Sequence, residues 1–210
     1  MKPSQLLFIT FAALQLAGCA IGQKIDYRQT APQLSVKADK PVAVAVLDER
    51  PYVVARNKDA TYVGNIRGLY YNPWSVRTYS GSPLSADLQD AVQKALARAA
   101  ITALPSQTSD RAPQGQKLLV LKLREWKSDA YMRVRFDYDV ITQVLDDQGK
   151  VLASEEIKGS GPTNNVILSG TQVLTNAIDA PAIAGALAKG NTPDWTLHFA
   201  REKARLARAF

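Results

Sequence analysis

The chain has 210 residues, with 26 Lys and Arg against 19 Asp and Glu, which gives a formal net charge of +7 at pH 7. Hydrophobic residues make up 46% of the chain, which is enough for a buried core and excludes wholesale disorder. One cysteine and one histidine exclude a disulfide framework and a metal site with several Cys and His ligands. We therefore expect an ordered protein with no metal ion and no cofactor.

The N-terminal residues have the pattern of an export signal. Lys2 precedes an apolar run over residues 6–16, which is about half the length that a membrane-spanning helix requires. A run of this length behind a short positive region is typical of a secretory signal and not of a permanent anchor.

A short motif follows the apolar run: Leu16, Ala17, Gly18 and Cys19 resemble a bacterial lipobox. Small residues at positions 17 and 18 admit the backbone to a signal peptidase, and the thiol of Cys19 accepts a diacylglyceryl group. Cleavage before Cys19 leaves 1–18 as the signal peptide, and two or three acyl chains would then anchor the mature chain. The alternative is an ordinary secretory signal in which Cys19 stays a free thiol.

The residue after the cysteine predicts the membrane. It is Ala20 and not Asp, which by similarity to enterobacterial sorting favours the periplasmic face of the outer membrane, with the inner membrane as the alternative. Export argues against nucleic acid as a partner. The basic excess favours an anionic envelope surface or an acidic envelope protein as a partner, in addition to the membrane that holds the lipid.

The first part of the mature chain is predicted to be a tether. Residues 20–40 are polar and have no sustained period, so we assign 19–40 to the lipidated cysteine and a polar linker. At about 3.3 Å per residue, this linker would reach on the order of 70 Å when extended. The folded part would then stand away from the membrane.

The predicted domain, 41–210, begins with a strand. Residues 42–47 are apolar on both faces, which predicts a strand covered on both sides. A short strand over 62–66 precedes a loop rich in Gly, Asn, Pro and aromatic residues over 68–81. Ser82 and Pro83 then open an amphipathic helix that ends near Ala100 and packs one face on a sheet.

Three strands are predicted next, over 118–126, 133–145 and 151–157, with a turn over 146–149; alternating side chains indicate an antiparallel meander. Residues 159–178 have no clear assignment. A short helix follows over 179–187, and the last helix starts near Pro193 with an aromatic stripe and a basic face. We expect that stripe to dock on the domain, with a membrane-surface helix as the alternative.

These elements define an α+β class: a single domain with a mainly antiparallel sheet packed against amphipathic helices. The segments 42–50, 82–97 and 118–127 give it an order of elements similar to the YajG-like outer-membrane lipoproteins. More distantly it resembles the modules of penicillin-binding-protein activators and of the curli secretion lipoprotein. The resemblance is mostly one of fold pattern, and it implies no catalytic residues.

Catalytic chemistry has few candidates. His198 is the single imidazole and no G-x-S-x-G elbow accompanies it, so we expect a structural role. Carboxylates that are adjacent on a strand face opposite ways. Asp137 and Asp139 share a face but alternate with Arg133 and Arg135, which predicts a solvated sheet face with cross-strand ion pairs. We therefore expect no enzymatic activity.

A binding surface has better candidates in the loop after residue 66. Tyr, Trp and Arg are enriched in interface hot spots because they bury a large area and keep a polar tip. The alternative is that the rings fold inward as a satellite core. The candidate residues are Arg67, Tyr70, Tyr71, Trp74, Arg77 and Tyr79.

Three hypotheses follow for function. The first is a membrane-anchored envelope lipoprotein that acts as a non-enzymatic accessory or scaffold and binds an envelope partner. The second is a transport-auxiliary lipoprotein for lipid or another hydrophobic cargo, which needs an apolar pocket between sheet and helices. The third, an envelope hydrolase around His198, is the least favoured.

Overall fold

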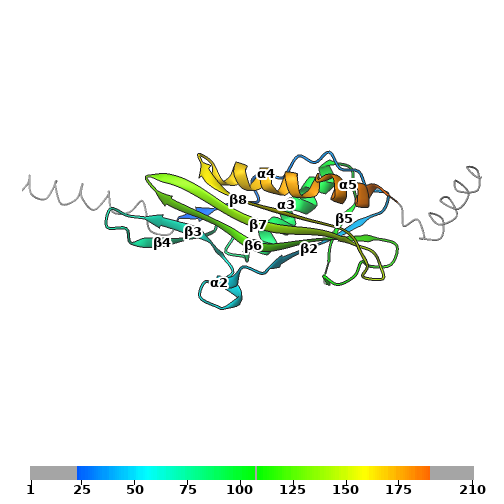
Figure 1. Cartoon of the computed structure of the whole chain (residues 1–210), viewed down its shortest axis with the longest axis horizontal. Helices are drawn as coiled ribbons and strands as arrows, with labels where there is room; N and C mark the ends of the chain where they lie inside the picture. The colour runs from blue at the N-terminus through cyan, green and yellow to red at the C-terminus, as the bar shows by residue number, and fades with distance from the viewer. Residues whose placement is uncertain (1–22, 107, 190–210) are drawn as a thin grey trace, which may run out of the picture.

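The computed structural model describes residues 23–106 and 108–189, which form one sheet of eight strands with helices packed on it (Figure 1). The strands are β1 (Lys24–Ile25), β2 (Val42–Asp48), β3 (Tyr62–Arg67), β4 (Pro73–Thr78), β5 (Ala103–Pro105), β6 (Lys117–Tyr131), β7 (Arg133–Leu145) and β8 (Val151–Thr163). The helices are α2 (Pro51–Val54), α3 (Leu84–Arg98), α4 (Val166–Ile178) and α5 (Pro181–Ala188).

The long strand β6 organises the sheet. Along one edge, its first half pairs in parallel with β2 and its last residues pair in parallel with β3. Along the other edge it pairs antiparallel with β7, which in turn pairs antiparallel with β8. Strand β5 adds to β2 in parallel, β4 adds to β3 antiparallel and β1 adds to β4 in parallel. The expected α+β domain and its antiparallel meander are confirmed, and the pairings of β1, β2, β3 and β5 make the sheet mixed.

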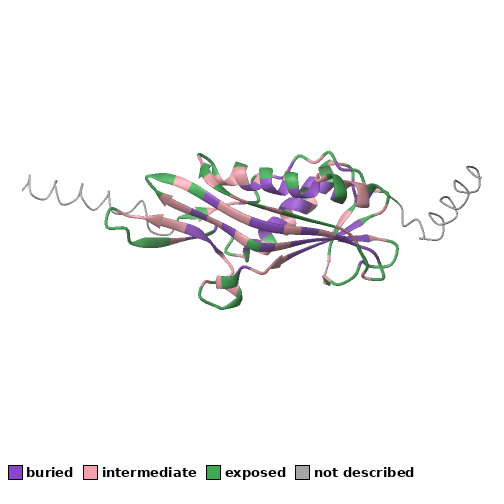
Figure 2. Ribbon diagram, in the orientation of Figure 1, coloured by how far each residue is buried: buried purple, intermediate pink, exposed green. Residues whose placement is uncertain are grey.

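Strand β2 is covered on both faces, as predicted. Val42 and Val44 belong to the main core under the helices, whereas Ala43 and Ala45 belong to a smaller core on the other face. The smaller core is closed by Ala112 from the loop before β6. Figure 2 shows the buried residues along the middle of the sheet and on the inner sides of the helices, and exposed residues at the hairpin ends.

Helix α3 lies where the spacing of apolar residues predicted a helix, but the residue that caps its start is not Ser82. Pro83 is the N-cap, and no side chain caps the helix. Instead, the buried carboxylate of Asp87 in the first turn accepts hydrogen bonds from Arg28 Nε at 2.7 Å and from Ser80 Oγ at 2.8 Å. A carboxylate here is favourable because of the partial positive charge at a helix N-terminus.

The predicted tether is wrong for residues 23–40. These residues pack on the domain: Tyr27 is 3% exposed and lies edge-on to the Trp126 ring, 5.8 Å between centroids. Asp179 accepts hydrogen bonds from the backbone N–H groups of Ser35 and Val36. Thr30 and Thr171 share a hydrogen bond of 2.8 Å. We call residues 23–40 the strap; it has no period because it crosses the helix layer as neither helix nor long strand.

Three further segments differ from the prediction or extend it. The predicted loop over 68–81 contains β4, which lies between β1 and β3 and carries Pro73 at its first position, where a strand tolerates proline. The segment 159–178, which had no assignment, contains the end of β8 and helix α4, whose N-cap Asn165 accepts from the N–H of Leu168. Strand β6 runs on to Tyr131. The short helix after Ala180 is α5.

Several predictions fall outside the described residues. They are the signal peptide and lipobox with Leu16, Ala17, Gly18 and Cys19, the site of His198, and the last helix from Pro193. Within the part of the chain that the structure describes, no helix is long and apolar enough to cross a membrane.

Candidate functional site

Two chain reversals lie side by side at one end of the sheet. The β3–β4 connection is next to the β6–β7 turn because Ile66 of β3 pairs with Ala130 of β6. Arg67 binds Asp129 with Nε–Oδ1 and Nη2–Oδ2 distances of 2.8 and 2.5 Å. Tyr71 from one turn contacts Tyr131 from the other, with ring centroids 5.0 Å apart. The two turns therefore form one continuous surface.

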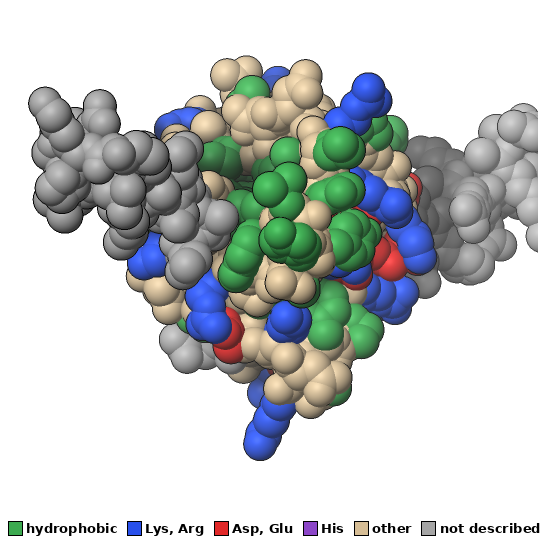
Figure 3. Space-filling view, turned by 90° about the vertical axis from the view of Figure 1, so that its left-hand side faces the viewer, with side chains coloured by type: hydrophobic (Ala, Val, Ile, Leu, Met, Phe, Trp, Pro, Cys, Tyr) green, Lys and Arg blue, Asp and Glu red, His purple; other side chains and the backbone are tan. Residues whose placement is uncertain are grey.

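This surface is mostly apolar and aromatic. Leu69, Tyr70 and Met132 are 95, 91 and 96% exposed, and the other members are exposed to lesser degrees. Figure 3 shows hydrophobic side chains gathered in the middle of this end, with Lys and Arg side chains around them. Large exposed patches of this kind mark interaction sites on soluble domains. We define the end surface by its six side chains: Leu69, Tyr70, Tyr71, Trp74, Tyr131 and Met132.

The end surface is held by defined contacts below it. The ring of Tyr71 lies over the Arg67 guanidinium, 4.4 Å from its centroid, a cation–π arrangement. The ring of Trp74 lies on Gly68 so closely that a Cβ at position 68 would come within 2.4 Å of it. Any larger residue at position 68 would therefore displace the Trp74 ring. These contacts position Tyr71 and Trp74 even though both side chains reach solvent.

A buried arginine fixes the base of this part of the fold. Arg50 is fully buried and binds Asp48 through Nε and Nη2, each at 2.7 Å. It also donates to the carbonyl oxygens of Tyr62 at 2.6 Å and Trp126 at 3.2 Å. The bonded residues belong to β2, β3 and β6, so Arg50 joins the three strands at the point where β3 takes the place of β2 beside β6.

The structure divides the candidate binding residues into two groups. Arg67, Tyr70, Tyr71 and Trp74 meet at the end surface or directly beneath it. Arg77 and Tyr79 lie farther along the chain; Arg77 forms an ion pair with Asp59 at 2.7 Å, and Tyr79 follows the end of β4. The exposure of Tyr70 and Tyr71 excludes an inward-folded satellite core for these two rings.

Sequence reasoning missed three members of the end surface: Leu69, Tyr131 and Met132. The predicted strand stopped at Trp126, whereas β6 continues to Tyr131 and reverses through Met132 into β7. An available signal was the turn itself, because an apolar Met stands where a tight hairpin turn favours Gly, Asn or Asp.

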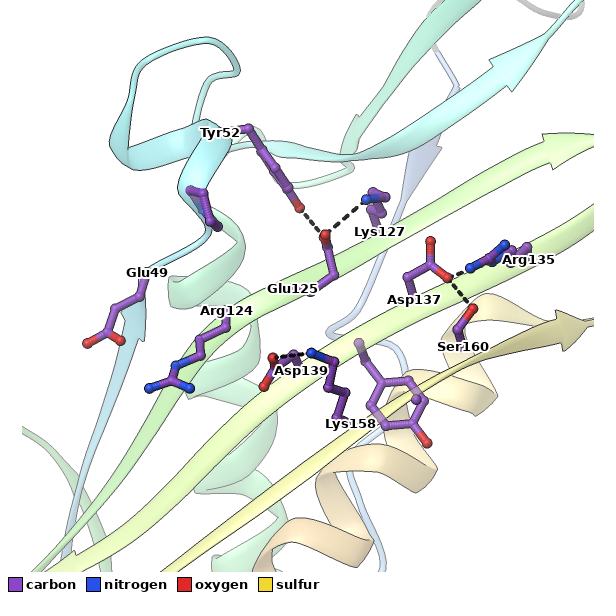
Figure 4. A pocket seen from close by; sticks show the side chains of 13 residues that line it. Glu49, Tyr52, Arg124, Glu125, Lys127, Arg135, Asp137, Asp139, Lys158 and Ser160 are labelled. Carbon is purple, nitrogen blue, oxygen red and sulfur yellow. Dashed lines mark hydrogen bonds and ion pairs between the residues drawn. The ribbon is translucent and has the colours of Figure 1, made fainter.

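A second candidate is a charged groove of about 610 Å³ on the outer face of β6, β7 and β8, beside α2 (Figure 4). Its four cationic and four anionic side chains balance. They are Arg124, Lys127, Arg135 and Lys158 against Glu49, Glu125, Asp137 and Asp139.

The carboxylates at the middle of the groove are already engaged. Glu125 accepts from the Tyr52 hydroxyl at 2.7 Å and from Lys127 at 2.9 Å. Asp137 accepts from Arg135 at 2.7 Å and from Ser160 at 2.6 Å. The predicted cross-strand pair is present between Asp139 and Lys158, which face each other in the register at 3.5 Å.

The pKa values in the groove favour fixed charge states. Partial burial opposes ionisation of Asp137, but the hydrogen bonds from Ser160 and Arg135 outweigh it and lower the pKa of Asp137. Burial and the neighbouring Glu125 raise the pKa of Tyr52, so its hydroxyl stays a donor. These groups keep their ordinary charges at neutral pH, and among residues 23–106 and 108–189 no group of acidic, His or Cys side chains has the arrangement of a metal site.

Hydrophobic cargo would need an apolar cavity between the sheet and the helices. Core side chains occupy this interface, among them Leu88 and Leu96 of α3 and Val173 and Ile178 of α4. One further groove lies at the edge of this interface, between β8 and α4, and many of its lining residues are polar.

Comparisons with known proteins give a fold but no family. No family model matches the chain, and no curated protein matches it either. Protein XCC0632 from Xanthomonas campestris, described as family DUF330, is similar in structure with a TM-score of 0.51 at 18% identity, covering 74% of this chain and 92% of that one. The chain therefore shares the α+β fold of that protein.

Two other solved structures are similar at lower scores. A PelC dodecamer from Paraburkholderia phytofirmans has a TM-score of 0.41 at 12% identity and covers 77% of this chain and 95% of its own. Lipoprotein GNA1162 from Neisseria meningitidis has a TM-score of 0.27 at 14% identity and covers 66% of this chain and 97% of its own.

Proposed function

We propose that this protein is a lipid-anchored accessory protein of the bacterial envelope, without enzymatic activity, that binds an envelope component through the end surface. The lipid is a diacylglyceryl group on Cys19, and the periplasmic face of the outer membrane is its location. The lipobox, the Ala20 that follows it and the order of elements support this anchoring and a place among YajG-like lipoproteins.

The end surface is the observation that carries the binding role. Leu69, Tyr70 and Met132 are almost fully exposed on two turns that are joined by ion pairing and ring contacts. Exposed apolar side chains lower their free energy when a partner removes them from water. The charged groove is a weaker candidate because Glu125 and Asp137 at its middle are satisfied by hydrogen bonds within the domain.

Site-specific photo-crosslinking in cells tests the binding role. A photoreactive amino acid is placed at Tyr70, and in a control at Val151, a half-exposed position at the end of β8 that lies away from the end surface. We expect a specific adduct from position 70 and none from position 151. Equal adducts from both positions, or none from position 70, would refute the binding surface.

Metabolic labelling tests the anchor independently. Labelled palmitate is expected to mark the wild-type protein and to leave a Cys19→Ser variant unmarked. The variant should also leave the membrane fraction or keep its signal peptide. An unmarked wild-type protein would contradict the proposed anchor.

A further inference from the structure

We infer that the end surface docks on the bilayer that carries the Cys19 lipid, so that the domain stands on the membrane with the β3–β4 and β6–β7 turns at headgroup level. This inference rests on the proposed lipid anchor and names the component that the end surface binds.

The first argument is the length of chain between the lipid and the fold. Because the strap is docked on the domain, only the stretch from Cys19 to Gln23, the first residue that the structure describes, separates the lipid from the fold. Four residue steps span at most about 14 Å, instead of the long reach of an undocked linker. The backbone carbonyl of Gln23 accepts from the N–H of Arg77 at 3.2 Å, which fixes the point where this short segment leaves the sheet.

The second argument is the direction in which that segment leaves. Strand β1 is parallel to β4, with Lys24 opposite Arg77. Strand β4 starts at Pro73 beside the end surface and runs away from it, so β1, which runs in the same direction, begins on the side of the end surface. Trp74 lies three residues before Arg77, about 10 Å along the strand. The acyl chains on Cys19 therefore reach the bilayer on the same side as the end surface.

The third argument is the chemistry of the end surface. Leu69 and Met132 are the most exposed side chains and are aliphatic, whereas Tyr70, Tyr71 and Trp74 have an apolar ring with a polar tip. Tyr and Trp prefer the headgroup region of a bilayer for this reason. Leu69 and Met132 would therefore enter the acyl-chain region, while the neighbouring aromatic side chains would lie among the headgroups.

The fourth argument is charge. Asp129 at this end is neutralised by Arg67, and Asp59, at the other end of the β3–β4 pair, is neutralised by Arg77. Lys24 and Arg133 are exposed and form no ion pair with any described residue. The exposed cations favour attraction to anionic lipid headgroups.

The backbone at the two turns supports a role for the side chains themselves. Tyr71 and Met132 have φ angles of 63° and 57°, in the left-handed region that glycine adopts at lower cost. The chain keeps large side chains at both positions, and both belong to the end surface.

Spin labelling of the lipidated full chain tests the docking. Cys19 is the one native cysteine and is blocked by its lipid, so Leu69→Cys or Met132→Cys introduces a single free thiol. Val151→Cys is the matched control, because Val151 pairs with Leu145 at the far end of β7. Each labelled protein is placed in vesicles of phosphatidylethanolamine and phosphatidylglycerol.

The measurement is the accessibility of each nitroxide to oxygen, which concentrates in the bilayer, and to a water-soluble nickel chelate. We expect the oxygen-to-nickel ratio at positions 69 and 132 to be several-fold higher than at position 151. Equal ratios at all three positions in protein that still floats with the vesicles would overturn the docking and leave the anchor intact.

Two other outcomes are informative. Protein that does not float with vesicles would show that the lipid anchor, and with it the proposed function, has failed. Dipolar broadening at positions 69 and 132 without oxygen accessibility would show that a second copy of the chain covers the end surface, which also overturns bilayer docking. The photo-crosslink from Tyr70 should correspondingly be a lipid adduct, and a protein adduct there would contradict the inference.

Discussion

Replacing Arg50 with methionine should lower the free energy of unfolding more than any surface substitution, because Arg50 joins β2, β3 and β6. The guanidinium is fully buried and satisfies both oxygens of Asp48 and the carbonyls of Tyr62 and Trp126. Methionine has a similar volume but no donor. The variant therefore leaves a mostly buried carboxylate and two buried carbonyl oxygens without partners.

The expected loss follows from these contacts. Removing one partner of a buried ion pair costs about 3–5 kcal/mol, which includes the unpaired groups left behind. With a urea m-value of about 2 kcal/mol/M, a loss of about 4 kcal/mol lowers the midpoint of unfolding by about 2 M. The assay is equilibrium urea unfolding of the purified protein, followed by far-UV circular dichroism.

Arg77→Met is the matched control. Arg77 also forms an ion pair at 2.7 Å, but its side chain and that of Asp59 are 56 and 44% exposed, so the loss should be about 0.2–1 kcal/mol. An Asp48→Asn/Arg50→Met double variant should recover part of the loss, because it removes the unpaired carboxylate. A midpoint for Arg50→Met equal to that of Arg77→Met would refute the buried-pair reasoning.

Three other predictions follow from single sites. Gly170→Val should destabilise the domain by about 1–3 kcal/mol through overpacking, since a Cβ at Gly170 would lie 2.7 Å from the Trp126 ring; thermal unfolding measures this, and an unchanged midpoint would contradict the close contact. Lys117→Met should cost about 3 kcal/mol, because the buried ammonium binds Asp39 at 2.5 Å and carbonyl oxygens at the end of α5; faster hydrogen exchange in α5 would be the specific sign. Asp137→Asn should destabilise at pH 7 by no more than about 1 kcal/mol. Because the pKa of Asp137 is lowered on folding, its stabilisation is present above the unfolded pKa near 3.9 and is lost as the pH falls through the folded pKa. The wild-type and Asn curves should therefore converge in acid, and a constant difference down to pH about 2 would exclude this cause.

Elements with a clear local period were predictable. Strand β2, helix α3 and the β6–β8 meander each follow a pattern of apolar residues that neighbouring positions encode. The assignments became less accurate where that pattern changes. The end of β8 was not predicted because it contains Gly and Pro residues, which are unusual in strands. These last residues pair with Phe136 to Val134 of β7. The predicted strand ended five residues before the end of β6, because apolar and polar residues stop alternating near Ser128 and Asp129.

The strap shows a different kind of failure. Its apolar residues, Ile25, Tyr27 and Val36 among them, have no helical or strand spacing, so nothing in the local pattern indicates burial. Tyr27 and Val36 are buried, and Ile25 is partly buried, because the strap packs on the domain, with Tyr27 against Trp126 and Thr30 bonded to Thr171. Complementarity to a distant surface cannot be read from a window of sequence.

The candidate binding surface was half predictable. The density of aromatic and arginine side chains after residue 66 pointed to the β3–β4 turn by composition alone. Met132 and Tyr131 joined it only through the pairing of β3 with β6, which brings positions more than sixty residues apart in sequence to one end of the sheet. The exposure of each ring also depended on that packing.

The sequence by itself determined the identity and order of the main elements, because helix and strand periods are local properties of the chain. Only the tertiary structure showed that Gln23 lies close to the end surface, and the bilayer docking that we infer depends on this short distance. It could do so only through non-local contacts: the strap needs two helices already in place, and the two turns meet only after β3 has paired with the last residues of β6.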